Sequence, residues 1–336
     1  MREAFGISEM KQGARRAVST LTVAFSMAVA SSSYADSSTL PPEVGYNYGQ
    51  IETARSAGMG GALRAFSNST DALFANPANM AATRVYHLGA LAQIYPQADR
   101  QTYGAAIVDS IVSASRLAGG VSATWNRQDP SGVDRTYFDV RFALAYPFSD
   151  HFFLGATGRY LSLKQDGFPR GLYSLHPSAA AGGLNDKAIV ENLTFEAGLT
   201  VKPVNEVAIS LVGQNLTDPG NGYLPLMLGG GIAYGSDLFT VEGDVLGDFT
   251  TYNESKARVM FGGEFLAGDH FPLRAGYRYD QGAVTHAISF GAGYTDTAYS
   301  IDLALQQTVS GGASTAITIG FTYHVETSGM APETDY

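Results

Sequence analysis

After its first quarter, the sequence alternates apolar and polar side chains in runs of roughly ten residues. In the run 136–146, Phe138 and Phe142 fall on one face, whereas Asp139 and Arg141 fall on the other. A period of two predicts β-strands whose faces meet different surroundings. Ten residues is about the length that a tilted strand needs to cross a bilayer. No later run reaches the roughly 18 apolar residues of a membrane helix, so a membrane location would require a closed barrel.

Counting all such runs gives fourteen expected strands. After the second strand, the connections between them are alternately short and long, as in bacterial barrels with short periplasmic turns and longer outer loops. The second connection, 110–116, is longer than this rule prefers. The alternative, a large soluble β-sandwich, does not predict this alternation. We therefore expect an all-β, antiparallel, up-and-down transmembrane barrel with both termini in the periplasm. The expected strands span 84–95, 101–109, 117–126, 135–147, 151–164, 191–202, 205–216, 226–235, 237–247, 256–267, 270–280, 285–295, 298–307 and 313–325.

The first 35 residues have the features of an export signal. Basic residues precede an apolar run at 17–30 that is too short to span a bilayer, and 33–35 fits a cleavage site. The alternative is a cytoplasmic amphipathic helix. Residues 1–35 hold four basic and two acidic residues, so 17 Lys and Arg remain against 29 Asp and Glu, a net charge of −12. This acidic balance argues against nucleic acid as a partner.

Residue types that carry chemistry are sparse. The chain has no cysteine, which excludes disulfides, thiol nucleophiles and Cys-bound metals. The six histidines are scattered without metal-ligand spacing, and no G-x-S-x-G motif occurs. We therefore expect no enzyme, no catalytic residue, no metal site and no cofactor.

The stretch 49–82 stands apart because it is rich in Gly and Ala and lacks the strand pattern. Asn76 is a suitable helix cap, and Pro77 suits the first helical position, where a missing N–H costs nothing. Residues 68–71 offer further caps. Glycines at 58–61 permit tight turns. The stretch is therefore predicted to form a compact plug with two short helical turns. The alternative is a surface linker.

This stretch resembles the N-terminal signature of a known family. Residues 54–62 read ARSAGMGGA and are followed by Asp71-Ala72 and Asn76-Pro77-Ala78. The order is similar to that of FadL-like and PorV/PorQ-like outer-membrane β-barrel proteins. The sequence departs from the family at Asn79, where Gly is usual, and at 67–69, where acidic residues are common.

Later segments add to the likeness: VGQNL at 212–216, LP at 224–225, LRAGY at 273–277 and SFGAGY at 289–294. The resemblance implies a fourteen-stranded barrel whose N-terminal segment lies in the lumen as a plug, or hatch. It also implies an outer-membrane location in a Gram-negative bacterium. The residues that would form the plug motif are Arg55, Gly58, Gly60, Gly61, Asp71, Asn76, Pro77 and Ala78.

These observations divide the chain into five expected parts. The last strand carries Gly320, Tyr323 and Val325 in a pattern that resembles the insertion signal read by the barrel-assembly machinery. The parts are a signal peptide (1–35), a periplasmic lead segment (36–53), the plug (54–82), the barrel (83–325) and a periplasmic tail (326–336).

Charged residues in the barrel region share the phase that faces away from lipid, because a charge facing lipid near the midplane costs a few kcal/mol. Opposite signs fall on neighbouring strands: Glu242 and Asp244 beside Arg258, and Glu264 near Arg274 and Arg278. They form either a salt-bridged ladder that grips the plug or a polar path for a ligand head group. The mixture of signs does not suit an ion-selective ring. The expected lumen charges are Asp139, Arg141, Arg159, Glu196, Glu242, Asp244, Arg258, Glu264, Arg274, Arg278 and Asp280.

Two functions fit this architecture. The compact size and the mixed-charge lumen favour a non-enzymatic scaffold or docking barrel of an envelope-spanning secretion, surface-attachment or motility complex, as the PorV side of the resemblance implies. The alternative, implied by the FadL side, is a plugged channel for small hydrophobic solutes such as long-chain fatty acids. The expected partners are outer-membrane lipid and the barrel-assembly machinery, together with other envelope proteins or a small hydrophobic ligand.

Overall fold

The structure is a computed structural model. The expected signal peptide, the lead segment up to residue 50 and the tail from residue 328 lie outside the described residues, so they remain predictions. The described residues are 51–113, 116–129, 134–165, 188, 190–220 and 223–327.

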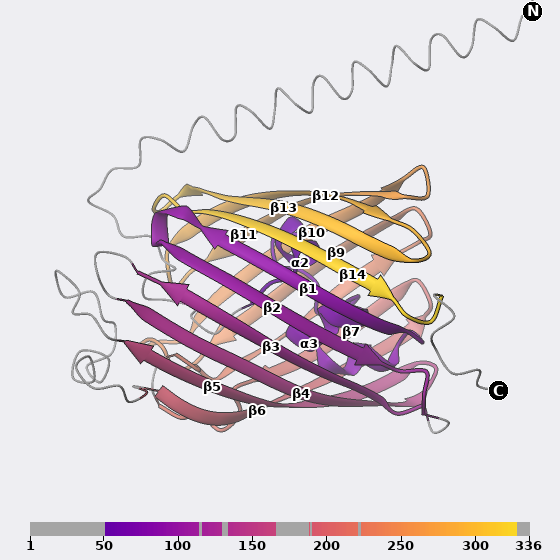
Figure 1. Cartoon of the computed structure of the whole chain (residues 1–336), viewed down its shortest axis with the longest axis horizontal. Coiled ribbons are helices and arrows are strands. Elements are labelled where there is room, and N and C mark those ends of the chain that lie inside the picture. The colour runs from indigo at the N-terminus through magenta and orange to yellow at the C-terminus, as the bar shows by residue number, and fades with distance from the viewer. Residues whose placement is uncertain are drawn as a thin grey trace, which may run out of the picture. The chain divides into compact units, whose positions relative to one another are not determined.

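Within these residues, antiparallel strands form one closed barrel, in which β1 (Tyr86–Tyr95) pairs with β14 (Thr315–His324) to complete the ring (Figure 1). This confirms the expected fold class, and all fourteen expected strands are present with ends close to the expected ones. The other strands are β2 Arg100–Asp109, β3 Ala118–Gln128, β4 Arg135–Ser149, β5 Phe152–Gln165, β6 Val190–Val204, β7 Val207–Gln214, β8 Met227–Gly235, β9 Phe239–Asp248, β10 Lys256–Ala267, β11 Phe271–Asp280, β12 Thr285–Thr295 and β13 Tyr299–Ser310.

The connections differ in length between the two ends of the barrel. The strand bounds leave 150–151, 205–206 and 268–270 as tight turns at one end, and 166–189 and 215–226 as long connections at the other. Exceptions include 110–117, a longer connection at the first end, and 96–99 and 281–284, short ones at the second. The start of β1 and the end of β14 lie at the end with the tight turns. We call the two ends the short-turn end and the loop end.

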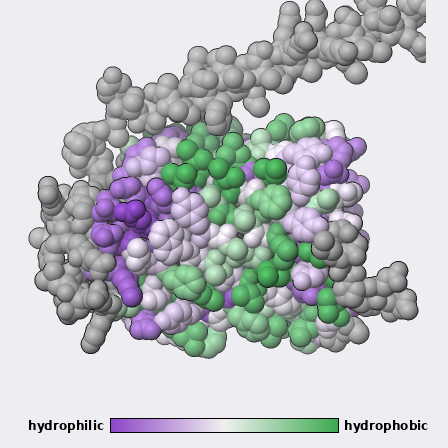
Figure 2. All heavy atoms as spheres, viewed as in Figure 1, coloured by the Kyte–Doolittle hydropathy of each residue, from purple (hydrophilic) through white to green (hydrophobic). Residues whose placement is uncertain are grey.

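The outward faces of the strands are apolar. Phe142, Leu211 and Phe290 are each more than half exposed, at 56, 60 and 59%. Figure 2 shows hydrophobic residues across the middle of the visible face and hydrophilic residues gathered toward one end. Exposed apolar side chains on a closed barrel would be unfavourable in water, whereas a lipid bilayer accommodates them.

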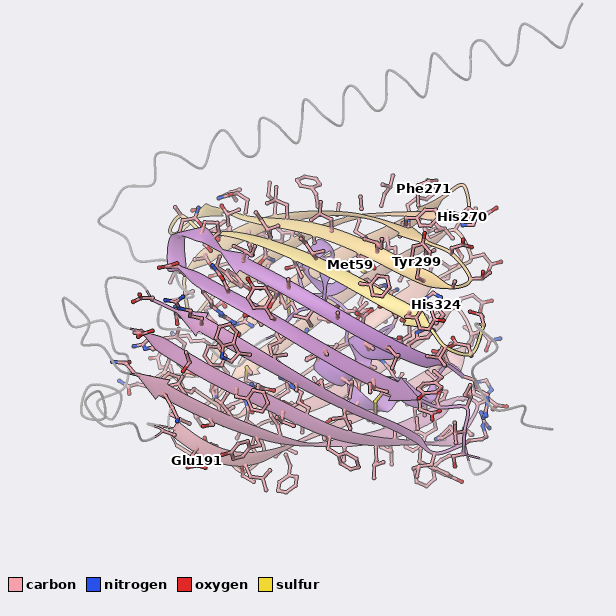
Figure 3. All side chains as sticks on the ribbon, viewed as in Figure 1. Met59, Glu191, His270, Phe271, Tyr299 and His324 are labelled. Carbon is pink, nitrogen blue, oxygen red and sulfur yellow. The ribbon has the colours of Figure 1, made fainter. Side chains whose placement is uncertain are left out.

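Aromatic rings gather near both ends of this apolar band. Tyr103 stacks with Trp125 near the loop end, with ring centroids 6.2 Å apart. Figure 3 shows His270, Phe271 and Tyr299 near the opposite, short-turn end. Such rings are typical of the two membrane–water boundaries of a spanning barrel.

Short helices precede the barrel strands. Thr53 caps the first helix by accepting a hydrogen bond from the Ser56 amide. The sequence analysis expected only glycine turns there, since a five-residue segment with four small residues carries little helical signal. In the described residues, no helix has the length and apolar character needed to cross a membrane. The helices are α2 (Ala54–Gly58), α3 (Ser69–Ala75), the 3₁₀ turn η3 (Pro77–Ala81) and the 3₁₀ turn η4 (Pro96–Ala98).

These N-terminal helices fill the middle of the barrel. Figure 1 shows α2 and α3 inside the ring of strands. Helix α2 contacts β11 to β14, α3 contacts β1 to β3, and η3 contacts β3 to β6. The main apolar cluster lies between plug and wall and includes Leu73, Phe74, Met80, Val108, Ala143 and Phe153. The core of this protein is therefore the interface between the plug and the inner face of the barrel.

Candidate functional site: the plugged lumen

Asn76 and Pro77 stand at the centre of the plug. Pro77 occupies the first turn of η3, and the Asn76 side-chain oxygen accepts a hydrogen bond from the Ala78 amide at 3.1 Å. The Asn76 amide group donates to the Arg64 carbonyl at 2.8 Å and to the Thr200 hydroxyl at 2.9 Å. Asn76 is fully buried, so these bonds satisfy a polar group that water does not reach.

Asn79, where the sequence departs from the family signature, extends the same network. Its amide group donates to Ser67 Oγ at 2.8 Å, and its side-chain oxygen accepts from the Thr200 hydroxyl at 2.6 Å. Thr200 belongs to β6, so one threonine of the wall bonds to both asparagines of the plug. Sequence reasoning treated Asn79 only as a departure and did not identify this role.

Glycines of the wall allow the plug backbone to approach closely. A β-carbon at Gly155 of β5 would lie 2.5 Å from the carbonyl carbon of Pro77, and one at Gly198 of β6 would overlap the Asn76 side chain. On the far side of the lumen, a β-carbon at Gly262 of β10 would lie 2.6 Å from Met59 Cβ. Any larger residue at these wall positions would push the plug away.

Ion pairs hold helix α2. Arg55 forms a two-pronged pair with Glu264 of β10, at 2.9 and 3.1 Å. Arg274 of β11 joins Glu264 at 2.6 Å and Asp302 of β13 at 2.5 Å. Glu264 and Arg274 therefore meet as expected, and Arg55 from the plug completes the cluster.

Other lumen charges have different partners from those we expected. Arg258 pairs with Asp280 at 2.8 Å, not with Glu242 or Asp244, and Arg278 pairs with Glu52 rather than with Glu264. Asp280 lies directly opposite Arg258 on the neighbouring strand β11, and Glu52 belongs to the N-terminal segment, so position on adjacent strands did not by itself identify the partners.

Glu242 and Asp244 instead bind the plug backbone. Asp244 accepts hydrogen bonds from the Leu63 and Arg64 amides at 3.0 and 3.1 Å, and from the Arg64 guanidinium at 3.1 Å. Glu242 accepts from the amides of residues 65 and 66, at 2.6 and 3.0 Å. Irregular backbone inside a barrel has unpaired amides, and two carboxylates of β9 satisfy four of them.

A quartet of buried charges lies on the opposite wall. Arg159 and Arg141 both contact Asp139, at 2.6 and 3.1 Å, and both contact Glu196, at 3.5 and 3.2 Å. The Arg141 guanidinium also lies 5.3 Å from the ring centre of Phe74 in the plug. Two cations and two carboxylates leave no net charge, so the quartet braces the wall and does not select an ion by its sign.

A cavity of about 380 Å³ lies beneath the plug and extends to the short-turn end. Arg55, Asp71 and Phe74 of the plug face it, together with Leu91 and Leu266 of the wall. Burial raises the pKa of Asp71 above its ordinary value, although the Arg55 guanidinium, 3.8 Å away, acts in the opposite direction.

A chain of hydrogen bonds ties α3 to the seam between β1 and β14. Ser69 Oγ lies 2.5 Å from His87 Nδ1, and His87 Nε2 lies 2.6 Å from Glu326 Oε1. The other Glu326 oxygen accepts from the Tyr86 amide at 3.0 Å. Sequence reasoning missed this chain because its members are far apart in the sequence. Within the described residues, no group of three or more His, Asp or Glu is arranged to hold a metal.

The expected insertion-signal residues lie on or next to the closing strand. Gly320 lies in β14 against Ala54 of α2, where an added β-carbon would lie 3.4 Å from the Ala54 side chain. Tyr323 pairs with Leu88 across the seam, and the Val325 amide donates to the Tyr86 carbonyl at 2.8 Å. The recognition role of these residues stays a prediction.

Comparison with protein families and with curated proteins finds no match. Solved structures with similar folds cover most of the chain. The monoaromatic hydrocarbon channel CymD has a TM-score of 0.61 at 15% identity, covering 83% of this chain and 98% of its own. The Pseudomonas putida toluene transporter TodX has a TM-score of 0.58 at 13% identity, covering 82 and 99%. A Pseudomonas aeruginosa FadL homologue has a TM-score of 0.55 at 16% identity, covering 81 and 98%. The chain therefore has the FadL-like fold, a closed fourteen-stranded barrel with its N-terminal segment in the lumen.

Proposed function

We propose that this chain is an outer-membrane channel for small hydrophobic solutes. The observation that carries the proposal is the FadL-like barrel with a cavity directly beneath its plug. The similar structures are named as a channel and a transporter for monoaromatic hydrocarbons and toluene. Their names favour the channel, which was the alternative in the sequence analysis, over the scaffold that it preferred.

The dimensions of the cavity support a small solute. Its volume of about 380 Å³ lies near the lower end of the usual range for ligand pockets, roughly 300–1,000 Å³. Phe74, Leu91, Ala106, Leu266 and Pro272 give it an apolar surface beside the charged one. A short or single-ring molecule suits this space better than an extended long-chain acid does.

The barrel surface supports the location and orientation. An outward apolar face with aromatic rings near both ends suits an outer membrane. Bacterial outer-membrane barrels have short periplasmic turns and longer outer loops, so we place the short-turn end in the periplasm.

Uptake by whole cells tests the channel. A strain lacking this protein should take up labelled toluene more slowly than the same strain complemented with the wild-type chain. Leu91→Trp, which fills the cavity, should reduce uptake, whereas the matched variant Leu88→Trp on the outward face of the same strand should not. Equal uptake with and without the protein would refute the channel.

A further inference from the structure

Two cavities in the lumen share part of their lining. The large one is the 380 Å³ space at the short-turn end. The small one, of about 30 Å³, is bordered by Arg141, Arg159 and Gln214 on the wall. Thr53, Asp71 and Phe74 line both. Among the described residues, these three are the ones that line both cavities, and we call them the septum between the two spaces.

The small cavity has the character of a hydrated space. Gln214 Oε1 and Arg64 Nε both belong to residues that border it, and both are buried without a hydrogen-bond partner among the described residues. A volume of 30 Å³ has room for about two water molecules, at roughly 10–15 Å³ each. The small space is therefore bordered by polar and charged groups, whereas the larger cavity is partly apolar.

The septum is closed by few contacts. Thr53 and Asp71 border both spaces, and the Arg55 guanidinium approaches the Asp71 carboxyl at 3.8 Å. The Phe74 ring fills the remaining gap beneath Arg141. By contrast, Asn76 and Asn79 and the Arg55–Glu264 pair are not among the residues that line the small cavity. Rotation of three side chains would join the two spaces while the plug keeps its attachments to the wall.

We propose that the permeation path crosses the plug through this septum and that Thr53, Asp71 and Phe74 form its constriction. The inference rests on the proposed channel function and adds its narrowest point. Opening requires side-chain movement within the plug, and the plug stays in the lumen throughout. Phe74 sets the width for an apolar solute, and the Thr53–Asp71 pair closes the polar side of the path.

Single-channel conductance in planar bilayers tests the constriction without a labelled solute. Phe74→Ala and Thr53→Ala should each raise ion conductance severalfold over the wild-type chain. Phe66→Ala, which truncates another plug phenylalanine that lines neither cavity, should leave it unchanged. Heat-modifiable migration on gels identifies variants that still form a barrel. Wild-type conductance in both folded septum variants would overturn the proposal.

A reversible lock provides the second test, because the chain has no cysteine of its own. In the variant Thr53→Cys/Asp71→Cys, oxidation should reduce toluene uptake to the level of cells without the protein, and a reductant should restore it. Mass spectrometry confirms the cross-link. Full uptake by the cross-linked protein would overturn the septum. If no form of the chain supports uptake but Phe74→Ala still raises conductance, the channel function fails while the constriction stands.

Discussion

The two halves of the plug are attached to the barrel by different means. The half around η3 is held by neutral hydrogen bonds from Asn76 and Asn79, and its backbone lies against Gly155 and Gly198. The half around α2 also lies against wall glycines, with Gly262 and Gly276 beside Met59, but it adds ion pairs, chiefly Arg55 with Glu264, and borders the large cavity. Both halves are fitted by shape, and only the α2 half is also attached by charge beside open space.

This difference indicates which half can move. Backbone packed against a glycine has no room to shift, since protein interiors are close-packed and resist small displacements. Ion pairs beside a cavity allow their side chains to rotate and re-form, and salt weakens them where water enters. We therefore regard η3 as the anchor of the plug and the cavity-facing side chains of the α2–α3 half as its adjustable part.

The largest expected effect comes from breaking the shape-fitted half. Gly155→Val would force a side chain into the Pro77–Ala78 backbone, and overpacking of this kind costs about 1–3 kcal/mol or more. We expect a displaced plug, higher bilayer conductance and a lower temperature of the heat-modifiable gel transition. Gly158→Val on the same strand is the control, because a β-carbon there meets Phe195 only at 3.9 Å. Equal behaviour of the two variants would contradict the anchor.

Removing the polar part of the anchor should have the next largest effect. Asn76→Ala leaves the Thr200 hydroxyl and the Arg64 carbonyl with fewer partners in a buried site, at a cost of about 1–3 kcal/mol. Combined with Pro77→Ala, it should also raise conductance. Asn68→Ala, at the exposed cap of α3, should change the gel transition much less. If the Asn76→Ala/Pro77→Ala variant has the conductance of the wild type, these two residues do not hold the plug in place.

A smaller effect is expected in the charge-attached half. Arg55→Ala leaves Glu264 with Arg274 as a remaining partner, so we expect a loss of only about 1 kcal/mol in barrel stability. Its conductance should rise and should lose part of its dependence on salt. Arg55→Lys keeps the charge but not the two-pronged geometry, so its conductance should lie between that of the wild type and that of Arg55→Ala. Conductance identical to wild type at all salt concentrations would show that this half is as rigid as the anchor.

The smallest expected effect is at the seam. Glu326→Gln weakens the link through His87 to Ser69, and this partly exposed site should contribute about 0.5–1 kcal/mol. The gel transition should shift slightly downward. Glu254→Gln, whose only ion-pair partner within the described residues is Lys256 on a highly exposed site, should not shift it. If Glu326→Gln lowers the temperature of the gel transition more than Asn76→Ala does, the main attachment of the plug is at the seam and not at η3.

The fold was predictable because its signal is local and repeated. Each strand must present alternate side chains to lipid and to the lumen. The apolar Phe138 therefore faces outward, and the charged Asp139 and Arg141 face the lumen. The short and long connections added an independent indication. The plug motif was found through the family resemblance together with its Asn-Pro cap. Helix α2 was missed because a five-residue helix, too short for two turns, has almost no period to detect.

The sequence by itself determined which residues face lipid, which face inward and which stretch lies outside the strand pattern, because alternation follows from backbone geometry alone. Only the tertiary structure decided the partners inside the lumen: Arg258 with Asp280, Asp244 with the plug backbone, and Ser69 with His87. The physical reason is that a charge on the inner face of a barrel can reach several strands and the plug at once. Its choice depends on distances that arise only when the ring closes around the N-terminal segment.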